Sequence, residues 1–318
     1  MAISLKLMAI KIDLIHIELM NKYIVVNYHY IRDQSDDGIK ACGIEEFKKH
    51  IDYFNKNYQV VTAEELYDAA VSGKEGKFCL LTFNDGLGEH YKVVMALLKK
   101  NKISGIFFPV GMTLRENKIP LTHKTQLILS KTGVPKLVEM FHEFFGDKYK
   151  IGDRIRVEPR RQFDDILTSN LKETLMKLPL EERKSFINDT FVKLYENEAK
   201  ISQELFISKE QLREMVNQRM EIGTHTYSHL SLETLTYENQ KKDIILGKEE
   251  IENVIGKECK IFSYPHLRYN DNTLKILEEL GIILSFAGGR RVVEKNDHRF
   301  TIPRYDANDF DALIKEDS

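Results

Sequence analysis

Short apolar runs alternate with amphipathic segments along the first third of the chain. The runs are rich in β-branched and aromatic residues, which is typical of buried strands, and the segments between them carry apolar residues at helical spacing. In chain order, the pattern predicts a strand at 24–31, a helix at 45–58, a strand and a helix within 58–73, a strand at 77–83, a helix at 90–102 and a strand at 103–111.

The same alternation returns in the last third. Strands are predicted in MEIGTH (220–225), CKIFSYP (259–265) and IILSFAGG (282–289), with helices at 235–256 and 270–281 between them, before TIPRYDAND closes the pattern at 301–309. Strand and helix in turn favour a parallel sheet with crossover helices, and about seven strands fit a (β/α) barrel that is incomplete in its strand count. In such barrels the chemistry gathers where the strands end.

The stretch from 115 to 205 breaks this pattern with helical segments rich in Lys and Glu and few strand signals. We interpret it as a helical insertion in a single domain that spans 20–318. Ser208, with Gln211 three residues later, predicts a capping box at the helix that follows. Residues 1–19 are interpreted as an N-terminal extension, because a chain that begins at Met20 would reach its first strand almost at once. Charged residues interrupt every apolar run in 1–19 before it reaches the length of a signal-peptide core or a membrane span, so no export signal is expected.

Charge and cysteine usage exclude several classes of protein. The chain has 47 basic and 49 acidic residues in an interleaved arrangement, which disfavours nucleic acid as a partner. Cys42, Cys79 and Cys259 are widely spaced and odd in number, so neither a disulfide framework nor a cysteine zinc site is indicated. A reducing, cytoplasmic location is the expectation, with no transmembrane segment; the oligomeric state is left open.

Three polar side chains follow predicted strands. Asp85 ends the LLTF run, and His225 and His229 lie in THTYSH directly after MEIG. Two histidines four residues apart, with a carboxylate from another strand, form a two-histidine, one-carboxylate set that leaves positions open for water and substrate. Nitrogen and oxygen ligands favour zinc or another first-row divalent ion. Each piece alone has a simpler interpretation, a loop for NDG and solvent-facing histidines for HxxxH.

Four segments together resemble the polysaccharide deacetylase (NodB homology) family, carbohydrate esterase family 4, in order and spacing. They are TFNDG, GIFFPVG, EIGTHTYSHLSL and FSYPHLRYND. The resemblance covers 24–113 and 206–310 and skips the insertion. It implies a distorted (β/α) barrel of the NodB type, an acetylated carbohydrate as substrate, and a divalent metal, most simply Zn, held by Asp85, His225 and His229.

The family motif usually reads TFDDG, and its first aspartate is the general base. Asn84 stands there in this chain, and its amide cannot accept a proton from water. His29 and His266 are candidates for the missing catalytic group. The family's late LxH motif, which supplies the usual acid, has no clear counterpart, because His298 lies in a polar turn and is expected to be exposed.

The resemblance also suggests residues that contact substrate. Tyr264 and Pro265 match the segment that shapes the family's groove and offers a backbone N–H to the oxyanion. Arg268 either contacts substrate or is a solvated loop cation. Arg304 either pairs with a carboxylate to fix an active-site loop or forms a barrel-closing salt bridge, and the second is favoured. The chain lacks tryptophan, so Tyr305 or Phe310 is expected to replace the family's groove tryptophan.

One further histidine, His123, opens the insertion in PLTHKTQ. It is interpreted as a surface residue at a helix start, with a lid over the site as the alternative.

The sequence thus predicts a metal-dependent deacetylase that removes an acetyl group from an amino sugar in a polysaccharide, glycolipid or sugar-nucleotide precursor, with Asn84 impairing turnover. The alternative is a catalytically silent metal- or sugar-binding protein of the same fold. A natural or engineered origin of Asn84 is compatible with both.

Overall fold

A ring of short parallel strands forms the centre of the molecule. The computed structural model describes residues 21–33 and 39–317, and the extension expected at 1–19 lies outside these residues. The strands are β1 (Lys22–Tyr28), β2 (Gln59–Val60), β3 (Lys77–Asp85), β4 (Ile106–Pro109), β5 (Glu221–Ile222), β6 (Ile261–Ser263), β7 (Leu284–Phe286) and β8 (Tyr305–Asp306).

Backbone pairing runs around the whole ring. The main sheet has the order β5-β4-β3-β1-β8, with β2 paired to the first half of β3, and β6 pairs with β7. Isolated bridges join the two sheets: Thr224 to Phe262 after β5, and Phe286 to Ile302 just before β8. All these pairings are parallel. The expected distorted (β/α) barrel is therefore confirmed, with single bridges in place of full ladders at two positions.

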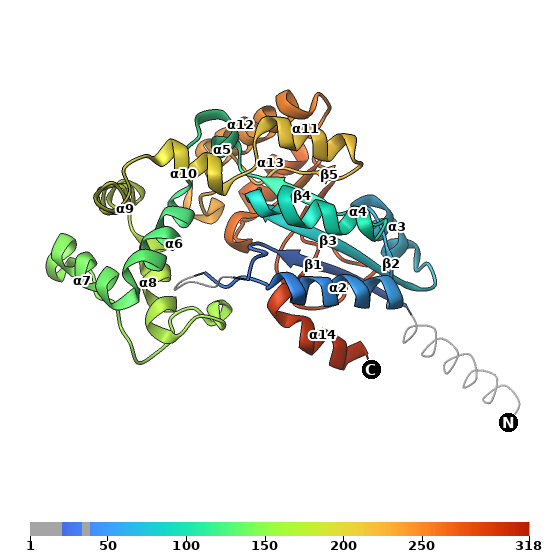
Figure 1. Cartoon of the computed structure of the whole chain (residues 1–318), viewed down its shortest axis with the longest axis horizontal. Coiled ribbons are helices and arrows are strands. Elements are labelled where there is room, and N and C mark those ends of the chain that lie inside the picture. Colours follow the sequence, from blue (N-terminus) through green and yellow to red (C-terminus); the bar gives the residue numbers. More distant parts are fainter. Residues whose placement is uncertain (1–20, 34–38, 318) are drawn as a thin grey trace, which may run out of the picture.

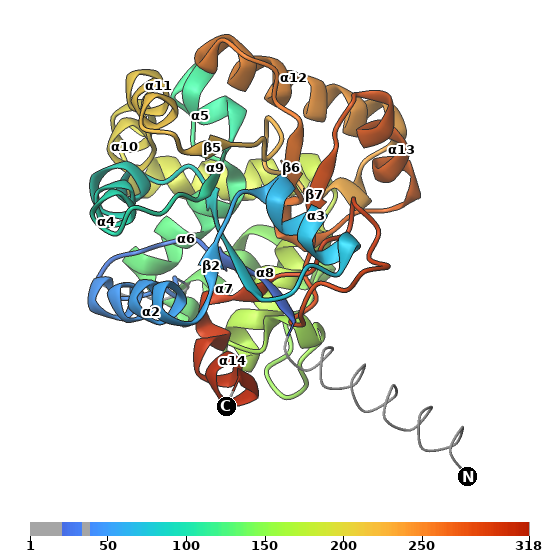
Figure 2. The same cartoon turned by 90° about the vertical axis from the view of Figure 1, so that its right-hand side faces the viewer.

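Helices cover the outside of the ring and one of its ends. Figure 2 shows α2, α4, α11, α12 and α13 around the strands, with α3 over their near end. Thr62 caps α3 together with Glu65, and Ser208 caps α11 together with Gln211 as the sequence predicts. The helix bounds are α2 (Ile44–Asn57), α3 (Ala63–Ser72), α4 (Ala96–Lys100), α11 (Lys209–Asn217), α12 (Tyr237–Ile255), α13 (Asp271–Glu279) and α14 (Phe310–Asp317).

Between β4 and β5 the described chain is helical. Several of these helices lie on one side of the strands, at the left of Figure 1, and share a hydrophobic cluster that contains Leu129, Phe141, Leu171 and Phe186. Their bounds are α5 (Gly111–Glu116), α6 (Leu121–Thr132), α7 (Val134–Phe145), α8 (Ile166–Lys177), α9 (Leu180–Leu194) and α10 (Glu198–Leu205). None of the helices within 21–33 and 39–317 is both long and apolar enough to cross a bilayer.

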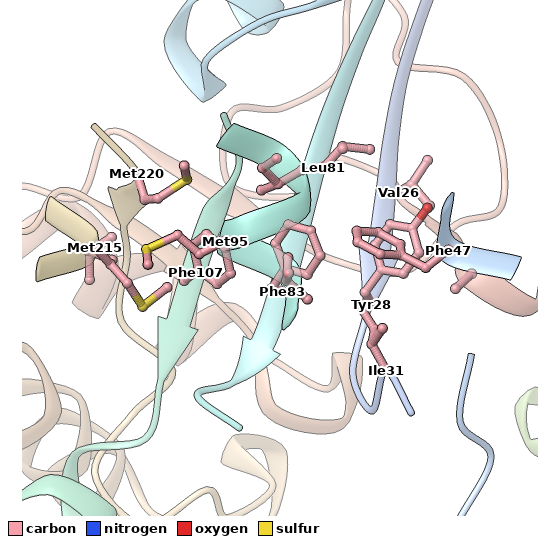
Figure 3. Packing of buried hydrophobic residues seen from close by; sticks show 14 of the residues in the cluster. Val26, Tyr28, Ile31, Phe47, Leu81, Phe83, Met95, Phe107, Met215 and Met220 are labelled. Atoms are coloured by element: carbon pink, nitrogen blue, oxygen red, sulfur yellow. The ribbon is translucent and has the colours of Figure 1, made fainter. Parts of the chain in front are cut away.

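Strand alternation divides the core into two layers. Along β1, Val25 packs inside the barrel, in a cluster with Leu80, Ile106 and residues of α3, because successive strand side chains point to opposite faces. Val26 and Tyr28 point outward to the helices. Figure 3 shows this outer layer, where Phe83 stacks on Phe107 at 4.6 Å between ring centroids. Cys79, expected to be a buried strand residue, is fully buried here.

Two predicted elements differ in form. The segment expected as one helix at 90–102 begins as a π-helix, His90–Met95, and continues as α4. The strand expected in MEIGTH pairs over only two residues, and the two-residue strand β8 forms in TIPRYDAND, where no strand is expected. β5 and β8 are the two end strands of the main sheet and pair at the barrel rim. Their length is therefore set by tertiary pairing and not by the apolar pattern.

Burial of two histidines outside the candidate site makes stability depend on pH. Burial lowers the pKa of His50 and of His90 to about 4, against 6.5 for the free side chain. Below pH 6.5 the unfolded chain binds protons that the folded chain excludes. The free energy of unfolding should therefore fall between pH 6.5 and 4, by up to about 1.4 kcal/mol per pH unit for each histidine.

Chemical denaturation of the metal-free protein at half-unit steps from pH 7 to 4.5 measures this slope. Replacing His90 by Gln should flatten the slope, whereas replacing the exposed His298 should leave it unchanged. A flat wild-type profile down to pH 4.5 would contradict the expectation.

Candidate metal centre

Asp85, His225 and His229 meet at the carboxyl end of the barrel. Asp85 is the last residue of β3, and both histidines follow β5, two strands along the ring. Asp85 Oδ1 lies 3.4 Å from His225 Nε2 and 3.2 Å from His229 Nε2. All three side chains are buried, and their ligand atoms lie within 4.8 Å of one another. The structure therefore brings together the three ligands that the sequence predicts.

Around this group the backbone adopts conformations that residues other than glycine rarely adopt. Asp85 (φ 77°), Thr226 (φ 65°), His229 (φ 57°) and His266 (φ 58°) are left-handed although none is glycine. Such residues cost free energy and tend to cluster at functional sites. The turns that carry these side chains are thus held by the surrounding barrel rather than by local preference.

The three residues fit a divalent cation. Atoms bound to one Zn²⁺ at about 2.0–2.2 Å stand roughly 3.0–3.4 Å apart, which is the spacing found around Asp85 Oδ1. Oδ1 is buried and has no hydrogen-bond partner among the described residues, so a cation would satisfy it. His225 Nδ1 lies 2.7 Å from the Ser263 carbonyl, to which it donates, leaving Nε2 free to coordinate.

Electrostatics at the site also suit a cation. Burial raises the pKa of the Asp85 carboxyl, but the charges of His229 and His123 outweigh burial and hold that pKa well below its usual range. Burial lowers the pKa of His225 to about 4. A carboxylate beside a neutral imidazole is the protonation state that metal binding requires.

His123 is buried, so its interpretation as a surface residue is wrong. It lies on α6 of the insertion, is fully buried, and its Nε2 is 3.2 Å from Asp85 Oδ2. It stands outside the group whose ligand atoms converge within 4.8 Å. His123 therefore serves as a hydrogen-bond donor that orients Asp85 from behind, leaving Oδ1 for the cation. Nothing in the sequence spacing indicates this contact, because it joins two elements 38 residues apart.

Arg304 corrects the expectation of a barrel-closing salt bridge. Its guanidinium is buried inside the rim and donates to Asn27 Oδ1 (2.9 Å), Asn84 Oδ1 (3.1 Å) and Ser263 Oγ (3.0 Å), all neutral. No carboxylate pairs with it among the residues described. Burial lowers its pKa to about 9. A carboxylate in place of Asn84, directly before Asp85, would meet this buried cation.

The two catalytic histidine candidates follow different strands of the barrel. His266 is half-buried, with its ring 4.8 Å from that of His229 and its Nε2 3.3 Å from Thr122 Oγ1. His29 directly follows β1 and is half-buried, and its carbonyl accepts a hydrogen bond from His90 Nε2. Both lie near the rim that holds Asp85, and their catalytic roles stay predictions.

The residues expected to contact substrate make more contacts within the protein than the sequence predicts. Arg268 is buried and ion-paired with Glu158, Glu173 and Glu233, so the solvated-cation interpretation is wrong. The Tyr264 hydroxyl donates to the Phe300 carbonyl, which turns this ring into the core.

The backbone N–H of Tyr264 reaches the Phe286 carbonyl at 3.4 Å, a long bond. The oxyanion role of this segment, including Pro265 in the short turn that follows, stays a prediction. Of the two aromatic residues expected to replace tryptophan, Tyr305 lines a cavity, whereas Phe310 packs on His50 in the core. His298 is exposed, as expected.

A second group of ligand-type side chains, Cys42, Glu46 and His50, lies around the start of α2. Burial raises the pKa of the Cys42 thiol, so the protonated form that does not bind metal dominates. The Tyr28 hydroxyl lies 3.0 Å from His50 Nδ1. This group fits a metal less well than the group at Asp85. All three cysteines are free and buried, as their spacing predicts.

Two cavities flank the rim. The larger, of about 800 Å³, reaches Arg304 and Asn27 and is lined by aromatic side chains, Phe163, Tyr269 and Tyr305 among them. Its volume falls in the range of small-molecule sites. The smaller, of about 80 Å³, lies in the insertion against His266. The Arg and Lys side chains around it were not singled out from the sequence, where they look like ordinary charges of a solvated helical segment.

Comparison with known proteins supports the motif-based interpretation. The family model described as polysaccharide deacetylase matches residues 162–284, a range with both histidines and without Asp85. The "Putative polysaccharide deacetylase YxkH" of Bacillus subtilis (strain 168) is 36% identical over 75 residues. That match covers 24% of this chain and 27% of the relative, so the chain matches about a quarter of the relative's length.

Solved structures share the fold. Streptococcus pyogenes deacetylase PplD, solved in complex with acetate, is 16% identical with a TM-score of 0.60, over 93% of this chain and 98% of its own. IcaB from Ammonifex degensii is 17% identical with a TM-score of 0.60, over 93% and 97%. Motifs, the family-model match over 162–284 and the shared fold agree, and the chain resembles the polysaccharide deacetylase (NodB homology) family, carbohydrate esterase family 4, in all three.

Proposed function

We propose that this protein is a metal-dependent deacetylase that hydrolyses the acetamide of an amino sugar within a polysaccharide, glycolipid or sugar-nucleotide precursor. The observation that carries the proposal is the buried group of Asp85, His225 and His229, with an unsatisfied Asp85 Oδ1 between two imidazole Nε2 atoms. A divalent ion held there, most simply Zn²⁺, would polarise the acetyl carbonyl and lower the pKa of water toward neutrality.

The chain's own residues supply orientation and binding. Ser263 fixes the His225 ring through its carbonyl, and His123 holds the second oxygen of Asp85. The cavity of about 800 Å³ beside Arg304 offers aromatic faces and polar groups of the kind that hold a sugar ring. His29 and His266 are the proposed proton carriers, and Arg268, Tyr264 and Pro265 border the proposed substrate path.

Asn84 supports a second candidate function, a catalytically silent metal- or sugar-binding protein. Its Oδ1 accepts from Ser263 Oγ at 3.1 Å and from Arg304 Nη1 at 3.1 Å. The amide oxygen thereby accepts two hydrogen bonds from the protein, and the NH₂ group can only donate. Asn84 can orient a water molecule or a substrate group, but it cannot take a proton from either.

Acetate release from a panel of acetylated amino sugars, their oligomers and sugar nucleotides tests the proposal. Zinc-loaded protein should release acetate from at least one substrate, and chelator treatment should abolish the release until zinc is restored. Substrate binding without acetate release, in protein shown to contain one metal per chain, would favour the silent alternative. Failure to bind either metal or glycan would rule out both.

A further inference from the structure

We infer that the insertion carries a binding pocket for an anionic group, a phosphate or carboxylate borne by the glycan, next to the metal group. The pocket is the cavity of about 80 Å³ between α6, α8 and α9. Three cationic side chains line it: Arg161, Lys172 and Arg183. The inference that a glycan bears this anionic group rests on the proposed function. The inference that the pocket binds an anion does not.

Arg183 is the residue that indicates a bound ligand. It projects from α9, its Nε is buried without a hydrogen-bond partner, and no carboxylate pairs with its guanidinium within the described chain. Burial lowers its pKa to about 10, with no neighbouring charge offsetting that effect. An enclosed cation without a counter-ion is costly unless a ligand supplies the opposite charge.

The neighbouring cations are already matched by protein carboxylates. Lys172 Nζ lies 2.9 Å from Asp164, and Arg161 Nε lies 3.4 Å from Glu173, which also binds Arg268. These pairs fix the pocket walls and leave a positive charge at Arg183. The hydroxyl of Thr122 also lines the cavity and can donate to an oxyanion, whereas the Thr125 hydroxyl already donates to the Leu121 carbonyl.

The pocket is connected to the candidate metal centre through His266. This side chain lines the pocket, and its ring lies 4.8 Å from that of His229. An anion held at Arg183 would therefore share His266 as a neighbour with the metal group, so a charged substituent of the substrate would bind beside the acetamide.

Size and chemistry select the kind of group. A volume of about 80 Å³ has room for a phosphate or carboxylate group. Guanidinium groups bind both oxyanions through two parallel hydrogen bonds. The pocket therefore favours a phosphorylated or carboxylated glycan over a neutral one.

Isothermal titration of the zinc-loaded full-length protein with inorganic phosphate, and separately with acetate, at constant ionic strength tests the inference. Arg183→Gln removes the charge, and Arg213→Gln on α11 is the matched control at an exposed arginine. Arg183→Gln should weaken binding of the preferred anion about tenfold or more, whereas Arg213→Gln should leave it unchanged. The preferred anion then identifies the group as phosphate or carboxylate.

Thermal stability provides a second readout. Without added anion, Arg183→Gln should melt at the same temperature as wild type or higher, because it removes a partly buried charge that has no carboxylate partner within the described chain. It should also lose the anion-induced rise in melting temperature. Equal anion affinity of wild type and Arg183→Gln would overturn the inference.

Comparing N-acetylglucosamine 1-phosphate with N-acetylglucosamine separates this inference from the proposed function. Tighter, Arg183-dependent binding of the phosphate sugar supports the pocket even if no acetate is released. Acetate release with no Arg183-dependent preference for either anion or the phosphate sugar would overturn the pocket and leave the proposed function standing.

Discussion

Asn84→Asp is expected to raise acetate release by about 10² to 10⁴-fold, the usual contribution of a general base. The new carboxylate would stand next to Asp85 in sequence and within hydrogen-bond reach of Arg304, whose Nη1 is 3.1 Å from the present amide oxygen. The same substitution supplies a counter-ion to a buried guanidinium that has only neutral partners. The free energy of unfolding should therefore rise by about 1–3 kcal/mol, the range for a charge-assisted hydrogen bond.

Asn27→Asp is the matched control. Asn27 Oδ1 is 2.9 Å from the same Nη1 atom, so a carboxylate there also neutralises Arg304. It lies on β1, away from Asp85, and should gain stability without gaining acetate release. Zinc content, acetate release and chemical denaturation are measured on wild type and both variants. If both variants activated the protein equally, the charge of Arg304 and not a missing base would be the cause of impairment.

Removal of a metal ligand should abolish tight zinc binding. Asp85→Asn keeps the side-chain shape and tolerates the left-handed backbone at φ 77°, but it removes the charge that attracts the cation. His225→Ala removes an imidazole whose Nε2 faces Asp85 at 3.4 Å. Each variant should fail to retain zinc through desalting, whereas wild type should keep one ion per chain by elemental analysis.

His123 and His142 complete this series. His123→Ala removes only the hydrogen bond to Asp85 Oδ2 and should weaken zinc affinity about 10 to 100-fold, the usual effect of a residue that orients a ligand. His142 is exposed on α7, and His142→Ala should leave the zinc affinity unchanged. Competition with a chromogenic chelator measures all four variants. Wild-type affinity in His225→Ala would contradict the assigned ligands, and complete zinc loss in His123→Ala would make His123 a ligand itself.

The order of elements could be predicted from the sequence, because apolar spacing reports which face of each segment is buried. The pattern was less informative where pairing is short, as in β5 and β8, since two paired residues leave little periodicity. Asp85, His225 and His229 could be assigned because motifs after parallel strands must meet at one rim, whatever the packing around them.

The sequence by itself determined the barrel, the three candidate ligands and the absence of a base at Asn84, since these depend on local pattern and residue type. Only the tertiary structure decided which side chains surround them: His123 from the insertion against Asp85, Arg304 among neutral oxygens, and Arg183 alone in its pocket. These contacts join residues up to 277 positions apart. No local pattern encodes them, because burial and pairing of a charge are properties of the packed chain.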